Sequence, residues 1–187
     1  RQPEVIQTFL LRTSVLERLT AHLCDAILHP DFTSSEKVLE HLERANLCRA
    51  NLIRANLLET MLVGAELLEA NLFGANLCGA RLWSANLVDA CLADANLEGV
   101  SLDGANLRGA DLSYADLSHA DLREAWLSEV NLERVDLSGV VLSGATLFWV
   151  NLIRADLRGA DLRGARLNEA DLEGANLEWA NLEWADL

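Results

Sequence analysis

The sequence lacks the features that nucleotide-hydrolysing enzymes and membrane proteins need. Its 187 residues hold no glycine-rich phosphate loop behind a strand, so no ATPase module is expected in them. No apolar run approaches the ~20 residues that span a bilayer, and no signal-peptide pattern begins at Arg1. The net charge of -14, with 51% hydrophobic residues, is that of a folded, acidic protein. We therefore expect no membrane contact and no membrane segment.

Cysteine and histidine are sparse and show no ligand spacing. We expect free thiols in a reducing cytoplasm from the four cysteines, Cys24, Cys48, Cys78 and Cys91. No metal site is expected from the four scattered histidines, His22, His29, His41 and His119. Acidic residues are plentiful, but surface carboxylates are usually solvated, so no catalytic pair stands out. The chain is predicted to be non-enzymatic, without cofactor or metal.

A strict period of five residues runs through residues 45–187. Every fifth residue from Leu47 to Leu187 is leucine, and two places before it stands a small or branched apolar residue, usually alanine as at Ala105. In an α-helix, leucines at every fifth position would be spread over all faces instead of forming one apolar face, so a helix is excluded. In extended chain the alanine and leucine share one face, and glycine is common in the two places where the chain must bend. The unit A-(N/D)-L-x-x thus predicts a short strand followed by a corner, stacked in a solenoid with its neighbours.

Runs such as Ala-Asp-Leu-Arg-Gly over 155–164 and Ala-Asn-Leu-Arg-Gly over 105–109 resemble the pentapeptide repeat family. The resemblance covers residues 45–187. It implies an all-β solenoid, a right-handed quadrilateral β-helix with four units per coil and about seven coils.

Residues 1–44 differ in kind and are predicted to form a small α-helical segment. Ser14 with Glu17, and Thr33 with Glu36, are capping boxes that open two helices on either side of Pro30. Such a segment is too small to be stable alone, and we expect it to pack against the repeat array as a cap on its open end.

The same head resembles the winged-helix-type region of MalT-like signal-transduction ATPases. The resemblance rests on Arg-Gln-Pro-Glu at 1–4, Phe-Leu-Leu-Arg-Thr-Ser-Val-Leu at 9–16, Leu-Cys-Asp-Ala at 23–26 and Leu-Glu-His-Leu-Glu-Arg-Ala-Asn-Leu at 39–47. It implies that Arg1 is internal to a longer protein and that the array takes the sensor position. An accidental helical cap is the alternative.

The residue after each leucine should point outward, and ten apolar residues follow one another there before ten polar ones. We call these ten the apolar belt: Cys48, Ile53, Leu58, Val63, Leu68, Phe73, Cys78, Trp83, Val88 and Ala93. Soluble monomers seldom expose such a belt, so it predicts a covering partner: residues 1–44, a module upstream of Arg1 or another subunit. The interface candidates are Leu58, Leu68, Phe73 and Trp83. Simple strand propensity is the alternative.

The charge distribution suggests a rival function. With four units per coil, one side carries Glu59, Glu98, Asp116, Asp136, Asp156 and Glu178 against Arg158 alone, while each other side has three arginines. This acidic face, centred on Asp116, Asp136 and Asp156, is the candidate for a DNA mimic that binds a type II topoisomerase such as DNA gyrase. A solvated surface is the alternative.

At the far end, Trp179 and Trp184 lie in adjacent units, and aromatic residues favour interfaces. If Leu187 is the terminus, an uncapped last coil predicts a homodimer through it; otherwise the repeats continue or a cap follows. The sequence thus favours an interaction or sensor scaffold of a signalling ATPase, then a DNA mimic, then a structural or self-assembling module. No direct nucleic-acid binding is expected.

Overall fold

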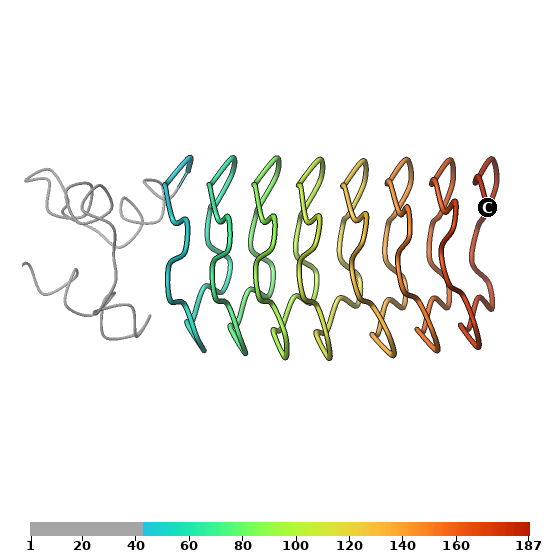
Figure 1. Ribbon diagram of the computed structural model, residues 1–187, viewed down its shortest axis with the longest axis horizontal. Coiled ribbons are helices and arrows are strands. Elements are labelled where there is room, and N and C mark those ends of the chain that lie inside the picture. The colour runs from blue at the N-terminus through green and yellow to red at the C-terminus, as the bar shows by residue number, and fades with distance from the viewer. Residues whose placement is uncertain (1–42) are drawn as a thin grey trace, which may run out of the picture.

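The computed structural model describes residues 43–187, so the helical segment expected over 1–44 lies almost wholly outside the described residues. Within residues 43–187 there is no helix and no strand longer than one residue. Isolated parallel bridges instead join residues twenty apart, from Asn46↔Glu66 to Arg166↔Asp186. The expected short strands are therefore single paired residues. Because twenty residues contain four units, the chain closes a four-sided coil every four units, and Figure 1 shows these coils stacked along a rod.

Residues that are twenty apart in the sequence occupy the same position on the same side of the rod. We number the sides by their first leucine: the first side begins with Leu47, the second with Leu52, the third with Leu57 and the fourth with Leu62. Side chains that lie twenty apart in the sequence are thus neighbours along one side of the rod. This geometry decides which residues can form a site together.

The repeat leucines and alanines form one continuous core inside the coils. From Leu47 to Leu167 each repeat leucine is at most 4% exposed, and Leu107 is fully enclosed. The inward placement predicted from the period is confirmed. Thr60 replaces one alanine and is the only buried polar residue in the described part of the chain; its hydroxyl donates to the Leu57 carbonyl at 2.8 Å.

Backbone hydrogen bonds join each coil to the next. Around Leu67, for example, its N–H donates to the carbonyl of Asn86 at 2.7 Å, and Asn86 N–H donates to the carbonyl of Ala65 at 2.9 Å. A third bond runs from Glu69 N–H to the carbonyl of Val88, also at 2.9 Å. These bonds use donors and acceptors along the sides, so a partner has no free strand edge to pair with there and must recognise side chains.

Every corner has the left-handed backbone conformation. The residue two places after each leucine has φ between 53° and 71°, from Arg44 to Trp184. Eleven of these corner residues are glycine, which adopts the conformation without steric cost, but eighteen are not. The stacked coils therefore impose the corner, and glycine eases it without being required.

Candidate functional site

The Asn or Asp before each leucine has a structural task that its outward position alone did not reveal. Each one from Asn46 to Asn181 accepts a hydrogen bond at Oδ1 from the N–H two residues on, at 2.9 to 3.4 Å. This Asx-type bond satisfies the one N–H of the unit that the backbone–backbone bonds, both between coils and within the turn, leave unused. We call this side chain the cap of its unit.

Three consecutive coils lack the cap on the first side. Trp126, Thr146 and Arg166 stand where Asn or Asp would otherwise be, and bridges join them in that order. Within residues 43–187 no side chain accepts from the N–H groups two residues on, those of Ser128, Phe148 and Asn168. In the capped units this N–H points toward the side chain two residues back. The repeated backbone therefore aims the Ser128 N–H at Trp126 and the Phe148 N–H at Thr146.

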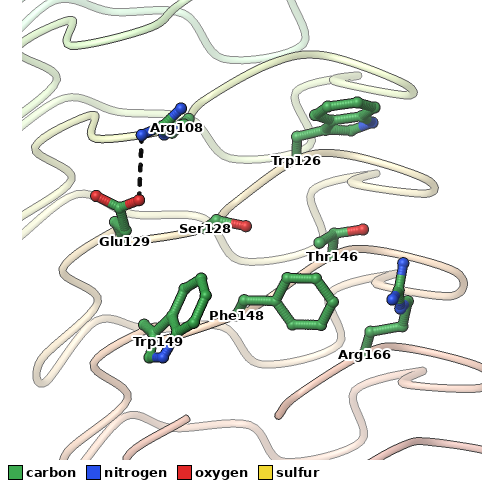
Figure 2. A pocket seen from close by; sticks show the side chains of 8 residues that line it. All are labelled: Arg108, Trp126, Ser128, Glu129, Thr146, Phe148, Trp149 and Arg166. Atoms are coloured by element: carbon green, nitrogen blue, oxygen red, sulfur yellow. Dashed lines mark ion pairs between the residues drawn. The ribbon is translucent and has the colours of Figure 1, made fainter. Parts of the chain in front are cut away.

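These uncapped units line a cleft of about 430 Å³, which we call the aromatic cleft. Figure 2 shows Ser128 and Thr146, two small hydroxyl side chains, in the middle of it, framed by larger residues on both sides. Its frame consists of Arg108, Trp126, Glu129, Phe148, Trp149 and Arg166. The cleft exists because small side chains in two coils lie between large ones in the same and the adjacent coils.

The aromatic rings of the cleft are held in place yet reach solvent. Trp126 is 60% exposed and Trp149 62%. Phe148 and Trp149 meet edge to face, with ring centroids 6.0 Å apart and planes at 66°. Trp149 also occupies a corner with φ 55°, a conformation that a bulky residue adopts only at a cost, and Gly109 fills the same corner two coils earlier. The ring of Trp149 therefore reaches solvent from a corner that glycine would fill without this cost.

Two arginines give the cleft a local positive charge. The Arg166 guanidinium lies over the Phe148 ring, 4.5 Å from its centroid, and forms no ion pair with any residue between 43 and 187. Arg108 Nη2 is 3.3 Å from Glu129 Oε1, and both side chains are more than half exposed. Two cations thus stand against one carboxylate, on a rod that is otherwise acidic.

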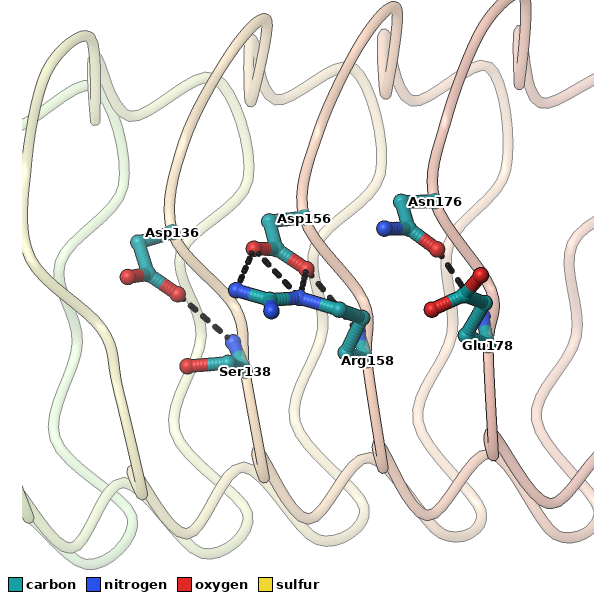
Figure 3. A network of polar contacts seen from close by, with 6 residues as sticks. All are labelled: Asp136, Ser138, Asp156, Arg158, Asn176 and Glu178. Carbon is teal, nitrogen blue, oxygen red and sulfur yellow. Dashed lines mark hydrogen bonds and ion pairs between the residues drawn. The ribbon is translucent and has the colours of Figure 1, made fainter.

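The third side carries the acidic residues expected there, but their carboxylates accept hydrogen bonds from the backbone or pair with an arginine. Asp116 and Asp136 cap the N–H groups of Ser118 and Ser138, both at 2.9 Å. Asp156 is paired with Arg158 by a contact of 2.6 Å, and the side-chain hydrogen bond lowers the pKa of this carboxyl (Figure 3). The acidic face is therefore interrupted at Asp156.

The same Asp-Leu-Arg unit forms pairs on the fourth side. Arg123 lies 2.6 Å from Asp121 and Arg163 lies 2.7 Å from Asp161, and in each case the side-chain hydrogen bond lowers the aspartate's pKa. An arginine two residues after an aspartate therefore neutralises it within one unit. This local pairing removes charge that a DNA mimic would need to present.

The apolar belt is partly exposed in the described coils. Ile53, Leu58 and Trp83 are 40 to 47% exposed, Leu68 and Phe73 are half-buried, and Ala93 is buried. Trp83 Nε1 donates to Ser101 Oγ on the same side. Because consecutive belt residues lie on consecutive sides, the belt surrounds the rod as expected. A partner for it stays a prediction.

Among the large hydrophobic residues of 43–187, Trp179 and Trp184 are the most exposed, at 90% and 85%. Both occupy left-handed corners, on the third and fourth sides, and Trp184 Nε1 donates to Glu183 Oε1 at 2.9 Å. The leucines of these last units are only partly buried. The homodimer through this coil stays a prediction.

Over residues 43–187 no group of His, Cys, Asp or Glu could hold a metal ion. None of the residues in this range belongs to a helix long and apolar enough to cross a membrane. Cys48, Cys78 and Cys91 are free and half-buried.

The sequence did contain a signal for the aromatic cleft. Read at intervals of twenty, Trp126, Thr146 and Arg166 form one row, and the next row begins at Arg108 and ends at Phe148. In chain order, two residues that follow a leucine and are neighbours on one side are separated by three equivalent residues on the other sides. The pattern of the cleft is therefore visible only at intervals of twenty residues.

Two protein families match the sequence. Pentapeptide repeats match in eight copies over residues 41–77, 90–128, 115–152 and 151–187. The MalT winged helix domain matches residues 1–56, of which the described part, 43–56, already has the five-residue coil. No curated protein matches the chain.

Several solved structures are similar to the chain. HetL, involved in heterocyst differentiation regulation in the cyanobacterium Nostoc sp. strain PCC 7120, is 36% identical over 76% of this chain and 76% of its own, with a TM-score of 0.47. Rfr23 from the cyanobacterium Cyanothece 51142 is 36% identical over 54% and 60%, with a TM-score of 0.32. QnrB1, a plasmid-mediated fluoroquinolone resistance protein, is 18% identical over 75% and 84%, with a TM-score of 0.40. The four-sided coil is seen in the twenty-residue bridges of this chain itself, and the family assignment rests on the repeat match.

Proposed function

Because the chain belongs to the pentapeptide repeat family and presents one aromatic cleft on a rigid rod, we propose that residues 45–187 are a protein-interaction scaffold. The observation that carries the proposal is the composition of the cleft. Tryptophan, phenylalanine and arginine are enriched at protein interfaces, and Trp and Arg dominate their energetic hot spots. Here two tryptophans, one phenylalanine and two arginines share one cleft.

We further propose that this scaffold is the sensor of a larger cytoplasmic signalling ATPase. The winged-helix match at residues 1–56 runs directly into the first repeats, which supports an array in the sensor position. Stacked coils present their side chains on a fixed backbone, so a partner would be recognised without rearrangement of the rod. Its binding would bias the attached switch through the difference in affinity between two states.

Site-specific photo-crosslinking in the source cells tests the scaffold function. A crosslinking residue is placed at Ser128 in the aromatic cleft, with matched positions at Ser113 on the second side and Ser138 on the third. All three follow a repeat leucine, so the substitutions are equivalent with respect to the core. We expect one protein to be captured reproducibly, with the first side giving the strongest product. Absence of a specific product from all three positions would refute a scaffold role for these sides.

The DNA-mimic alternative has weaker support from the surface. Asp156 is paired with Arg158, and the other three sides carry three arginines each. If the acidic face does bind gyrase, the unmodified protein at micromolar concentration slows supercoiling, and reversal of Asp116, Asp136 and Asp156 to lysine abolishes the effect. An unmodified protein without effect on supercoiling would eliminate this alternative.

A further inference from the structure

We propose that the aromatic cleft binds a carboxylate-bearing segment of a partner protein, with the carboxylate held over Thr146 and a bulky apolar side chain beside it against Trp126. The proposal rests on the scaffold function above and adds the chemistry of the partner. Three features of the cleft lead to it: unused backbone donors, an apolar frame and a local positive charge.

The backbone donors come from the missing caps. In the units that have Asn or Asp before the leucine, a side-chain oxygen lies in front of this N–H. At residue 146 the side chain is threonine, no acceptor for the Phe148 N–H is found among residues 43–187, and both residues line the cleft. The groups that filled this place in the other units are amide and carboxylate oxygens. An incoming carboxylate oxygen can therefore make the same hydrogen bond as the absent cap.

The charge of the cleft selects an anion over a neutral amide. Arg166 is the next residue along the same row and has no carboxylate partner among residues 43–187, while its guanidinium is kept in place over Phe148. Charge-assisted hydrogen bonds to a carboxylate are roughly twice as strong as neutral ones. A carboxylate above Thr146 would meet a backbone N–H, a hydroxyl and a guanidinium together.

The acidity of the surrounding rod argues against a polyanion such as nucleic acid. Residues 45–187 hold 22 acidic residues and 10 arginines, for a net charge of -12. A chain of phosphates would be repelled by most of this surface, whereas a single carboxylate needs only Arg166, because Arg108 is already paired with Glu129. One isolated acidic residue in a partner therefore matches the cleft better than a run of charges.

The exposure of the rings argues for a protein segment over a small molecule. Ligand pockets usually enclose 70–90% of a small ligand, but Trp126 and Trp149 are 60% and 62% exposed. A shallow aromatic surface is instead covered well by a broader partner, whose remaining contacts exclude water around the central anchors. The apolar anchor of the segment would cover the exposed ring of Trp126.

The test measures binding of labelled peptides to the full chain by fluorescence anisotropy. The peptides are short glycine/serine sequences that carry one phenylalanine and one glutamate at varied spacing. Each has a matched form with glutamine in place of glutamate and another with glycine in place of phenylalanine. We expect at least one spacing to bind, and both matched forms to lose about tenfold or more in affinity because each removes one of the two anchors.

The decisive variant is Thr146→Asn, which restores the cap seen in the other units and so occupies the Phe148 N–H. It should fold and yet lose peptide binding by about tenfold or more. The matched control is Val141→Asn, which restores a cap on the fourth side, outside the cleft, and should bind peptide like the parent.

Three outcomes would overturn the proposal: no peptide binds, the glutamine form binds as well as the glutamate form, or Thr146→Asn binds like the parent. None of these would affect a crosslinked partner obtained at Ser128 or on another side, so the scaffold function would survive. Conversely, peptide binding without any crosslinked protein would leave the cleft chemistry intact and remove the cellular function.

Discussion

The first and third sides of the rod share one backbone repeat and differ in the residue before the leucine. On the third side, Asp116, Asp136 and Asp156 cap the N–H two residues on, and Asp156 also pairs with Arg158. On the first side, Trp126 and Thr146 leave the equivalent N–H uncapped and line the aromatic cleft. The acidic side is thus internally satisfied, whereas the aromatic side keeps donors available for a partner.

This difference shows how a repeat protein can acquire a site without changing its fold. The leucine and alanine of each unit fix the core, and the coil-to-coil bonds fix the backbone. The residue before the leucine can then vary: Asn or Asp accepts a hydrogen bond from the N–H two residues on, and other residues leave this N–H without that acceptor. A run of uncapped units on one side therefore marks a candidate binding surface.

Both sides depend on the same core, so the largest effect is expected from Leu107→Asp. Leu107 is fully enclosed, and a carboxylate there has no partner, which costs about 4 kcal/mol or more. Chemical denaturation should show loss of the cooperative transition or a large drop in its midpoint. Leu107→Met, which keeps the volume, should change the free energy of unfolding by less than about 1.5 kcal/mol. A Leu107→Asp variant that unfolds like the parent would show that the residue is not inside.

Two glycines on the third side allow a finer test of corner strain. Gly139 and Gly159 have φ of 65° and 66°, so an alanine at either would cost about 1 kcal/mol. A Cβ at residue 139 would also lie 2.8 Å from Nδ1 of His119, while nothing lies within 4 Å of one at residue 159. Denaturation midpoints should fall further for Gly139→Ala than for Gly159→Ala. The double variant Gly139→Ala/His119→Ala should recover the difference; equal midpoints for the two single variants would contradict the contact.

Restoring a cap on the first side should stabilise the rod slightly. Thr146→Asn adds one side-chain hydrogen bond to the Phe148 N–H, worth about 0.5–1 kcal/mol. Thermal unfolding should shift upward, and Val141→Asn should give a shift of similar size because it caps the equivalent N–H of Ser143. A loss of stability in both variants would mean that the cap is not a stabilising element of the unit.

The smallest effect is expected at the ion pair of the third side. Arg158 lowers the pKa of Asp156, so the folded carboxyl titrates below the unfolded one. The pair thus stabilises the fold at pH above the unfolded pKa, and that contribution disappears as pH falls through the folded pKa. Arg158→Ala should raise the pKa of Asp156 toward the ordinary aspartate value, as measured by NMR titration, without a resolvable change in unfolding at neutral pH. An unchanged pKa would show that the pair does not persist in solution.

Much of the fold followed from the sequence because the five-residue period is unbroken. Inward placement of the alanines and leucines needed only the geometry of extended chain, and Leu107 and its equivalents are buried as predicted. Four units per coil came from the family resemblance, and the twenty-residue bridges confirm it. The single-residue bridges and the left-handed corners at residues such as Trp149 were not predicted, since the stacked coils impose them and local preference does not.

The site was harder to predict because its residues come from four coils. The sequence pattern identified Asn or Asp before each leucine as outward, but not as the acceptor for a backbone N–H. Without that role, Trp126, Thr146 and Arg166 were ordinary exceptions to the repeat. The sequence-derived candidates Trp179 and Trp184 are highly exposed, whereas nothing in the described coils shows a partner for them.

Amide hydrogen exchange of Phe148 tests the central claim most directly. Its N–H is uncapped, whereas the N–H of Ile153, in the next unit, donates to Asn151 Oδ1 at 3.0 Å. We predict that the Phe148 amide exchanges about tenfold faster than that of Ile153 in the parent, and that the two become alike in Thr146→Asn, because one hydrogen bond separates them. Equal protection of both amides in the parent would contradict the account, since the donor assigned to the aromatic cleft would already be occupied.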